Sequence, residues 1–329
     1  MKGRRPLPAR APLLALASAI ALALSTALAA TLAGCGVGEG EQRAGGAELR
    51  VTRDFGATLL RSSAVARVRD GQTVMRLLEA KHAVETRYGG RFVESIDGLS
   101  ASARAGRRDW FYFVNGIEAG VGATERELAV GDVIQWDYHR WDAAMRIPAI
   151  VGAYPEPFVH GADGKRIPTR LECGSGDELA CREVERRLSG VGVRVTRALL
   201  ASAGGSGLLR VIVARWAQAR RVRAAATLAR GPSTSGVFAR FRPGGAEIEL
   251  LDEAGQIARA APRGSGLVAA TAGEGDGVVW IVTGVDRAGV EAAAAALDPR
   301  RLRDSFAIAA TPRGTLALPL RSSTRGASR

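Results

Sequence analysis

Residues 110–141, with the sequence WFYFVNGIEAGVGATERELAVGDVIQWDYHRW, decide the fold and hold the densest group of aromatic side chains. Seven aromatic residues lie in this stretch, although the whole chain has only 8 Phe, 5 Trp and 4 Tyr. Two strands are predicted, at 110–114 and 133–138, bordered by turn pairs at 115–116 and 131–132. The density of rings indicates a small sheet with an unusually apolar, partly exposed face. We interpret this face as a binding surface and not as a catalytic centre.

Alternation along the strands sorts the side chains by face. In the first strand, Trp110, Tyr112 and Val114 point one way, whereas Phe111 and Phe113 point the other way. One predicted helix can cover only one face of such a sheet. In the second strand, the residues that share a face are Ile134, Trp136 and Tyr138.

The chain before this stretch predicts three more strands and the helix. Two β-favouring runs on either side of residues 54–56 indicate a hairpin. After a turn at 70–71, Val74, Leu77 and Leu78 recur at helical spacing and predict a helix of about ten residues. Residues 92–96 predict a further strand, so the expected order is two strands, a helix and three strands.

Four motifs carry a specific resemblance to a known family. They are GQTVMRLLE at 71–79, FVESIDG at 92–98, WFYFVNG at 110–116 and GDVIQWDY at 131–138. In order and spacing they resemble the bacterial DUF4430 family, which is similar to the C-terminal domain of transcobalamin and intrinsic factor. The resemblance implies a β-grasp binding domain over residues 48–142, with cobalamin as the known ligand of the animal relatives.

The candidate ligand-binding residues come from the aromatic stretch. The resemblance implies a corrinoid-like ligand, and an axial ligand of corrinoid cobalt would need an accessible imidazole such as His139. Two alternatives stay open: Trp110 and Trp136 belong to the core, and His139 is a solvated strand end. The candidates are Trp110, Tyr112, Trp136, Tyr138, His139 and Trp141.

The first 34 residues have the pattern of an export signal. Basic residues within 2–10 precede an uncharged run at 11–33, and the sequence LAG at 32–34 leads to Cys35. This pattern resembles bacterial lipoprotein signals, in which the Cys is lipidated and becomes the first residue. We expect a lipid anchor at Cys35 that holds the protein on the extracytoplasmic face of the cell membrane. A retained transmembrane helix is the alternative, since a span needs about 20 apolar residues.

The rest of the chain divides into four parts. Residues 35–47 are rich in Gly and Glu and predict a flexible tether. Residues 143–164 form a Pro/Gly-rich connector whose apolar residues are expected to pack on the aromatic face. Alternating strands and helices over 165–312 predict an α/β domain with a mixed sheet, and 313–329 predict a disordered tail. The predicted fold class is α+β, with an N-terminal β-grasp domain followed by an α/β domain.

Cys173 and Cys181 remain as a pair once Cys35 is assigned to the anchor. In an oxidising compartment the plain prediction is a disulfide. Closing so short a loop contributes roughly 2.5 kcal/mol in the chain-entropy model. A metal site is the alternative, but the closest histidine in sequence is His160 and no C-x-x-C spacing exists. We therefore predict no metal site.

Catalytic motifs are missing from the sequence. The Walker, G-x-S-x-G, H-E-x-x-H and S-x-x-K patterns do not occur, so we predict neither enzymatic activity nor a cofactor. The net charge of +13 comes almost entirely from arginine. A nucleic-acid partner would need a clustered basic stripe with interleaved aromatic residues, and none is predicted. Anionic lipid or a wall polymer is the expected partner of this charge.

Two functions fit these observations. The first is a lipid-anchored binding protein that captures a small molecule in an open aromatic pocket and hands it to a membrane transporter. The second is a structural or adhesive surface lipoprotein that acts through protein contacts, with residues 148–158 covering the aromatic face. The exposure of Trp110, Trp136 and Trp141 separates the two.

Overall fold

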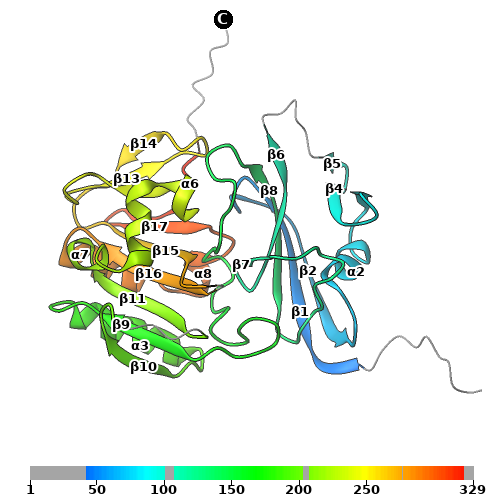
Figure 1. The fold of residues 1–329 in the computed structure, drawn as a ribbon, viewed down its shortest axis with the longest axis horizontal. Helices are drawn as coiled ribbons and strands as arrows, with labels where there is room; N and C mark the ends of the chain where they lie inside the picture. Colours follow the sequence, from blue (N-terminus) through cyan, green and yellow to red (C-terminus); the bar gives the residue numbers. More distant parts are fainter. Residues whose placement is uncertain (1–41, 101–106, 203–206, 276, 322–329) are drawn as a thin grey trace, which may run out of the picture. The chain divides into compact units, whose positions relative to one another are not determined.

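The computed structural model describes residues 42–100, 107–202, 207–275 and 277–321. They form mixed sheets with few helices, so the fold is α+β or mostly β (Figure 1). The predicted signal peptide at 1–34, the lipidation residue Cys35 and the first part of the tether lie outside the described residues. Among the helices of the described ranges, none is both long enough and apolar enough to cross a membrane.

The N-terminal part builds a five-stranded sheet with the order β2-β1-β8-β6-β7. The central strands β1 and β8 are parallel, and the other neighbours are antiparallel. The sheet begins at Gln42, earlier than the predicted end of the tether at residue 47. The strands are β1 Gln42–Arg53, β2 Thr58–Arg69, β6 Arg108–Val114, β7 Ile117–Glu118 and β8 Val133–Arg140.

Two turns set the register of this sheet. The predicted hairpin joins β1 to β2, with Asp54 and Phe55 at φ 57° and 60°. The predicted turn after β6 places Asn115 and Gly116 at φ 54° and 76°, the left-handed pair that two-residue hairpins favour. A Cβ atom at Gly116 would lie 2.7 Å from the carbonyl oxygen of Ile150, so only glycine fits there.

One helix, α2 Val74–Glu79, packs on one face of the sheet. Thr73 caps its first turn by accepting a backbone hydrogen bond on its hydroxyl oxygen. The helix is shorter than predicted because the chain has already turned at His82, whose ring Nδ1 lies 2.7 Å from a carboxylate oxygen of Asp97. A separate three-stranded sheet follows, made of β3 Val84–Arg87, β4 Phe92–Ile96 and β5 Leu99–Ser100.

The C-terminal part builds a seven-stranded mixed sheet with the order β10-β9-β11-β16-β15-β17-β18. The first four strands in this order are parallel, and the remaining neighbours are antiparallel. The strands are β9 Thr169–Cys173, β10 Val195–Leu199, β11 Leu209–Arg215, β15 Gly266–Ala272, β16 Val278–Gly284, β17 Ala307–Thr311 and β18 Gly314–Leu318.

Both faces of this sheet are covered. Helices α3 Glu178–Gly190 and α7 Arg287–Ala295 pack on one face around Trp280. Short segments and a small sheet pack on the other face, and α8 Pro299–Leu302 precedes β17. The covering elements are α4 Trp216–Ala219, α5 Arg223–Ala226, η2 Thr227–Arg230, α6 Pro232–Ser235, β12 Ala239–Phe241, β13 Ile248–Leu251 and β14 Ile257–Ala260.

Two predictions about the C-terminal part need correction. Within the α/β pattern, residues 216–228 predict a single helix, but the structure breaks it into α4, α5 and η2, because the buried Val222 is extended and interrupts it. The tail expected to be disordered over 313–329 begins with strand β18, which pairs with β17 and buries Leu318. Residues 322–329 lie outside the described residues.

The connector between the two sheets is part of the core. Apart from isolated bridges, residues 141–168 contain no helix or strand. Ile147 and Ile150 share a hydrophobic cluster with Phe113, as expected for packing on one aromatic face. Tyr154 and Phe158 instead pack around Trp280 of the seven-stranded sheet.

Candidate functional site

Three predicted site residues, Trp110, Trp136 and Tyr138, lie in the hydrophobic core under α2. Their exposed fractions are only 6%, 3% and 5%. The rings of Trp110 and Tyr138 are 5.3 Å apart, and Trp110 Nε1 donates to the carbonyl of Leu99 at 2.9 Å. The sheet brings these residues together as predicted, in one buried cluster with residues of α2 and β4.

Tyr112 and Trp141 are the predicted site residues that stay partly exposed. The Tyr112 ring stacks on Trp136 with 4.8 Å between centroids, and its hydroxyl donates to the carbonyl of Val121 at 2.6 Å. Burial raises the pKa of Tyr112 to about 12. The guanidinium of Arg107 lies 5.5 Å from the centre of the Trp141 ring.

His139 lies on the opposite face of the sheet and is 1% exposed. Its ring is 4.5 Å from Phe111, 4.6 Å from Phe55 and 5.4 Å from Phe306 of the seven-stranded sheet's domain. The imidazole is therefore neither an accessible ligand nor a solvated strand end. The cause is that β8 continues through His139 and places its ring on the face where Phe55, Phe111 and Phe306 pack.

Asp137 lies on the same face as His139 and is completely buried. Its carboxylate accepts from Thr52 Oγ1 at 2.6 Å and from the backbone N–H groups of Phe55 and Gly56 at 3.0 and 2.8 Å. His139 Nδ1 lies 2.8 Å from the same carboxylate. These contacts hold the β1–β2 turn against β8 and leave no carboxylate oxygen of Asp137 without a partner.

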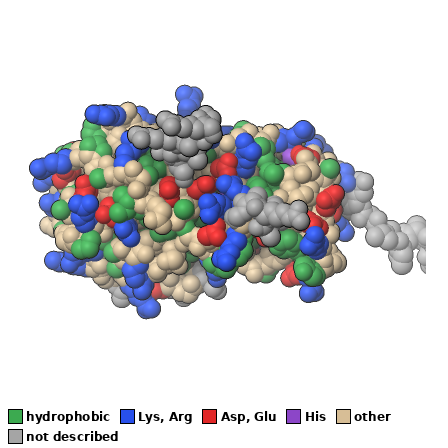
Figure 2. All heavy atoms as spheres, turned by 90° about the horizontal axis from the view of Figure 1, so that it is seen from above, with side chains coloured by type: hydrophobic (Ala, Val, Ile, Leu, Met, Phe, Trp, Pro, Cys, Tyr) green, Lys and Arg blue, Asp and Glu red, His purple; other side chains and the backbone are tan. Residues whose placement is uncertain are grey.

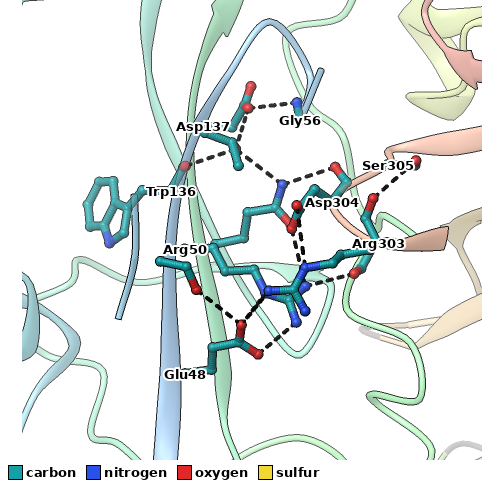
Figure 3. Close-up of polar contacts among 12 residues, drawn as sticks. Glu48, Arg50, Gly56, Trp136, Asp137, Arg303, Asp304 and Ser305 are labelled. Carbon is teal, nitrogen blue, oxygen red and sulfur yellow. Dashed lines mark hydrogen bonds and ion pairs between the residues drawn. The ribbon is translucent and has the colours of Figure 1, made fainter. Parts of the chain in front are cut away.

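A second group of polar side chains joins the five-stranded sheet to the C-terminal domain (Figure 3). Arg50 donates to both carboxylate oxygens of Glu48, at 2.9 and 2.7 Å, and to Asp304 Oδ1 at 3.3 Å. It also donates to the carbonyl of Gly152 at 3.0 Å. Gln135 Nε2 donates to the carbonyl of Asp304 at 3.2 Å. We call this group, Glu48, Arg50, Gln135, Asp137 and Asp304, the polar seam.

Charges within the polar seam compensate one another. Burial raises the pKa of the Asp304 carboxyl, and the nearby Arg50 and Arg303 oppose that rise. The pKa of Glu48 is also subject to burial, but Arg50 and Arg303 bring it below its ordinary value. The charged groups of the seam satisfy one another, whereas the buried Oε1 atom of Gln135 has no hydrogen-bond partner among the described residues. This arrangement suits the joining of two layers better than the binding of a ligand.

The predicted disulfide is present and links Cys173, at the end of β9, to Cys181 in α3. It fixes the first turn of α3 against the sheet. Among the residues that the structure describes, no group of three or more His, Cys, Asp and Glu side chains could hold a metal ion.

A surface hollow of about 500 Å³ lies in the C-terminal domain, over α4 and the β12–β13 hairpin. Trp216 and Phe241 line it and stack with 3.8 Å between ring centroids and 3° between planes. Gly245 lies so close that a Cβ atom there would be 2.7 Å from the Trp216 ring. We call it the Trp216 hollow; its lining is Trp216, Arg220, Ala226, Ala229, Arg240, Phe241, Arg242, Pro243, Gly244, Gly245 and Glu249.

The Trp216 hollow carries more positive than negative charge. Three guanidinium groups line it, against the single carboxylate of Glu249. Arg240 and Arg242 contact that carboxylate at 2.6 and 3.3 Å, and the hydrogen bond from Arg240 helps to hold the pKa of Glu249 below its usual value. Arg220 is exposed, and its side chain has no partner among the described residues.

The sequence predicts that Trp216 starts a helix and that Phe241 ends a strand, but it does not predict that their rings stack. Their contact depends on the β12–β13 hairpin folding back over α4, which no local pattern encodes. The available signal was the run of Gly244 and Gly245 next to arginine and aromatic residues, a composition that allows close backbone approach.

Residues 71–140 match the model of the DUF4430 family, described as a domain of unknown function. The match confirms the resemblance that the four motifs indicate. None of the curated proteins compared with the chain matches it.

Two solved structures share similarity with part of the chain. A "putative metal binding protein" from Ruminococcus gnavus ATCC 29149 is 14% identical, with 29% of this chain and 97% of that chain covered, at a TM-score of 0.24. Haptocorrin in complex with Cbi is 15% identical, with 33% of this chain and 27% of haptocorrin covered, also at 0.24. At this TM-score neither likeness bears on what the chain binds.

Proposed function

We propose that the chain is a lipid-anchored extracytoplasmic binding protein that captures a small anionic molecule in the Trp216 hollow. The observation that carries this proposal is the chemistry of the hollow: two stacked aromatic rings, three guanidinium groups and one carboxylate. Its volume of about 500 Å³ is in the range of small-molecule sites, about 300–1,000 Å³. The protein acts as a binder and not as an enzyme.

The physical reason for an anionic ligand is the surplus of arginine. Glu249 fixes Arg240 and Arg242 in place, so less side-chain entropy is lost when they bind a ligand. Arg220 remains without a carboxylate partner in the described residues. Guanidinium groups pair well with carboxylate and phosphate. Trp216 and Phe241 are each 3% exposed, so their stacked rings hold the β12–β13 hairpin and its arginines against α4.

The N-terminal domain serves in this proposal as a rigid neighbour of the binding domain. We propose a β-grasp arrangement for residues 42–140. The order β2-β1-β8-β6-β7, with parallel central strands and one helix on a face, supports it. The DUF4430 match keeps a corrinoid among the ligands to be tested.

The N-terminal sequence supports a location on the extracytoplasmic face of the membrane. The basic residues, the uncharged run and Cys35 support export and lipid anchoring. The Cys173–Cys181 disulfide supports an oxidising compartment. A lipid-anchored protein with a captured solute would be placed to deliver it to a membrane transporter.

The second candidate function is a structural or adhesive lipoprotein acting through protein contacts. Burial of Trp110 and Trp136 favours it, because the aromatic face expected to bind is packed under α2. Partner surfaces would then lie on exposed residues outside the Trp216 hollow.

Ligand capture can be tested by isothermal titration calorimetry of the purified protein. The ligands are cobalamin, cobinamide, haem and a panel of anionic metabolites. We expect at least one to bind, and the double variant Arg220→Ala/Arg242→Ala to bind it at least tenfold more weakly. Arg263→Ala, which removes an exposed arginine outside the hollow, is the matched control. Equal affinity of the double variant and the control would place the ligand elsewhere, and binding of none would favour the adhesive function.

A further inference from the structure

One long segment of the C-terminal domain contains no acidic residue. Residues 188–246 include ten arginines and no Asp, Glu or Lys. Figure 2 shows that side chains of both charge signs are mixed over one face of the molecule. Some of these arginines pair with carboxylates from outside the segment, such as Arg210 with Glu172 and Arg197 with Glu185. The others must face solvent or a ligand.

A second hollow, of about 510 Å³, gathers three of the arginines. Arg223 and Arg230 reach it from α5 and η2, which lie one after the other along the chain. Both are exposed, and neither side chain has a partner among the described residues. We call this the Arg223 hollow; its lining is Arg210, Arg223, Ala224, Ala226, Thr227, Arg230, Ala272, Gly273, Glu274 and Gly275.

Arg210 places one guanidinium group at a fixed position in the lining of the Arg223 hollow. It is 7% exposed, and its Nε and Nη2 atoms donate to the Glu172 carboxylate at 2.7 and 2.9 Å. That side-chain hydrogen bond raises the pKa of Arg210, so the guanidinium stays charged. Its Nη1 atom has no hydrogen bond to another described residue. One end of the hollow is therefore held in place before any ligand arrives.

The remaining lining is small and leaves room for a compact ligand. Ala224, Ala226 and Ala272 have short side chains, and Gly273 and Gly275 expose backbone. Glu274 is the single carboxylate in the lining, against three guanidinium groups. A singly charged carboxylate ligand would neutralise only one of them. A phosphate chain with several charges can pair with all three. Arg223 and Arg230 can bind phosphate oxygens in a bidentate manner, and Arg210 can donate through its Nη1 atom.

We infer that the Arg223 hollow is a second binding site, specific for phosphate groups of a multiply charged soluble ligand. It goes beyond the proposed function and does not depend on it. The two hollows share only Ala226 in their linings. Variants of Arg223 and Arg230 therefore leave the guanidinium groups of the Trp216 hollow in place.

Inorganic tripolyphosphate is the probe, titrated into the purified protein by calorimetry at about 50 mM NaCl. We expect saturable binding that the double variant Arg223→Gln/Arg230→Gln weakens at least tenfold. The control Arg194→Gln/Arg263→Gln removes two exposed arginines outside the hollow and should change affinity less than twofold. Unchanged thermal unfolding midpoints show that the variants fold. The single variant Arg223→Gln should also bind tripolyphosphate more weakly than the wild type, but less weakly than the double variant.

Two results would overturn the inference. One is tripolyphosphate binding that is absent, or equal in the double variant and the control, since the affinity would then not come from this hollow. The other concerns the source of the phosphate group. If the double variant loses sedimentation with phosphatidylglycerol–phosphatidylcholine vesicles but keeps its affinity for tripolyphosphate, the arginines contact a membrane surface instead.

Discussion

On one face of the five-stranded sheet, Trp110, Trp136 and Tyr138 pack with α2, whereas on the other face Arg50 and Asp137 meet partners through hydrogen bonds. Alternate residues of the same strands supply the two faces, and both faces are buried. The first face owes its stability mainly to apolar area removed from water. The second face is held by charged groups whose partners must be present and correctly placed.

The difference between the faces shows why a cluster of aromatic residues is weak evidence for a binding surface. The rings of the apolar face build the core on which α2 rests. On the other face, Arg50 and Asp137 are hydrogen-bonded to neighbouring strands, turns and the C-terminal domain. The candidate binding sites lie in that domain, where guanidinium groups outnumber carboxylates.

The largest effect is expected on the apolar face. Trp136→Ala should lower the free energy of unfolding by about 3–5 kcal/mol, because it removes a large buried side chain and leaves a cavity. Chemical denaturation measures the change. Trp136→Phe is the control: it keeps the ring and removes an indole N–H that has no partner in the described residues, so the loss should be below about 1.5 kcal/mol. A loss below about 1 kcal/mol for the alanine variant would mean that this face is not core.

On the polar face, Asp137→Ala should cost about 3 kcal/mol. The carboxylate accepts from Thr52 and from two backbone N–H groups. Its removal leaves the N–H groups of Phe55 and Gly56 without this acceptor, while Thr52 Oγ1 keeps the Trp136 carbonyl. Denaturation curves for this variant and for Asp142→Ala, an exposed aspartate on the same segment, provide the comparison. Similar curves for the two variants would show that the polar contacts around Asp137 do not contribute to the free energy of unfolding.

The coupling across the polar seam should be smaller. A double-mutant cycle of Arg50→Leu and Asp304→Asn should give a coupling energy of about 1–2 kcal/mol, since the pair is buried but long at 3.3 Å. Asparagine suits position 304 because the backbone there is left-handed, with φ 62°. Additive effects of the two substitutions would mean that the five-stranded sheet does not depend on this ion pair for its contact with the C-terminal domain.

The smallest effect concerns pH and the contact of His82 with Asp97 beside α2. The hydrogen bond from His82 holds the pKa of Asp97 below its ordinary value. A lowered folded-state pKa means stability that is present above the unfolded value, about 3.9, and is lost as the pH falls through the folded value. Asp97 is exposed, so the contribution stays below about 1 kcal/mol. Asp97→Asn should therefore flatten the loss of stability between about pH 5 and pH 2, and an unchanged profile would contradict the assignment.

Local patterns predicted the elements of the N-terminal sheet well. The turn at Asn115-Gly116 and the facing of Trp136 and Tyr138 follow from residue type and from the period of a strand. The DUF4430 resemblance was also visible from four motifs, and the family model confirms it. The disulfide between Cys173 and Cys181 followed from cysteine number and compartment.

Other features depended on contacts between distant segments. The sequence pattern predicts His139 as a strand end, but the rings of Phe55, Phe111 and Phe306 bury it. Strand β18 was missed because the short run at 314–318 has meaning only as a partner of β17. The Trp216 hollow was missed because α4 and the β12–β13 hairpin are brought together by the core and not by neighbouring residues.

Acrylamide quenching of tryptophan fluorescence tests most directly the claim that the aromatic stretch is core. Of the five tryptophans, Trp141 alone is partly exposed, and the others are 6% exposed or less. We predict that the wild type shows one quenchable fraction and that Trp141→Phe abolishes it. A quenchable fraction that persists in Trp141→Phe and disappears with a further Trp110→Phe or Trp136→Phe substitution would contradict the claim and restore the aromatic face as an open binding surface.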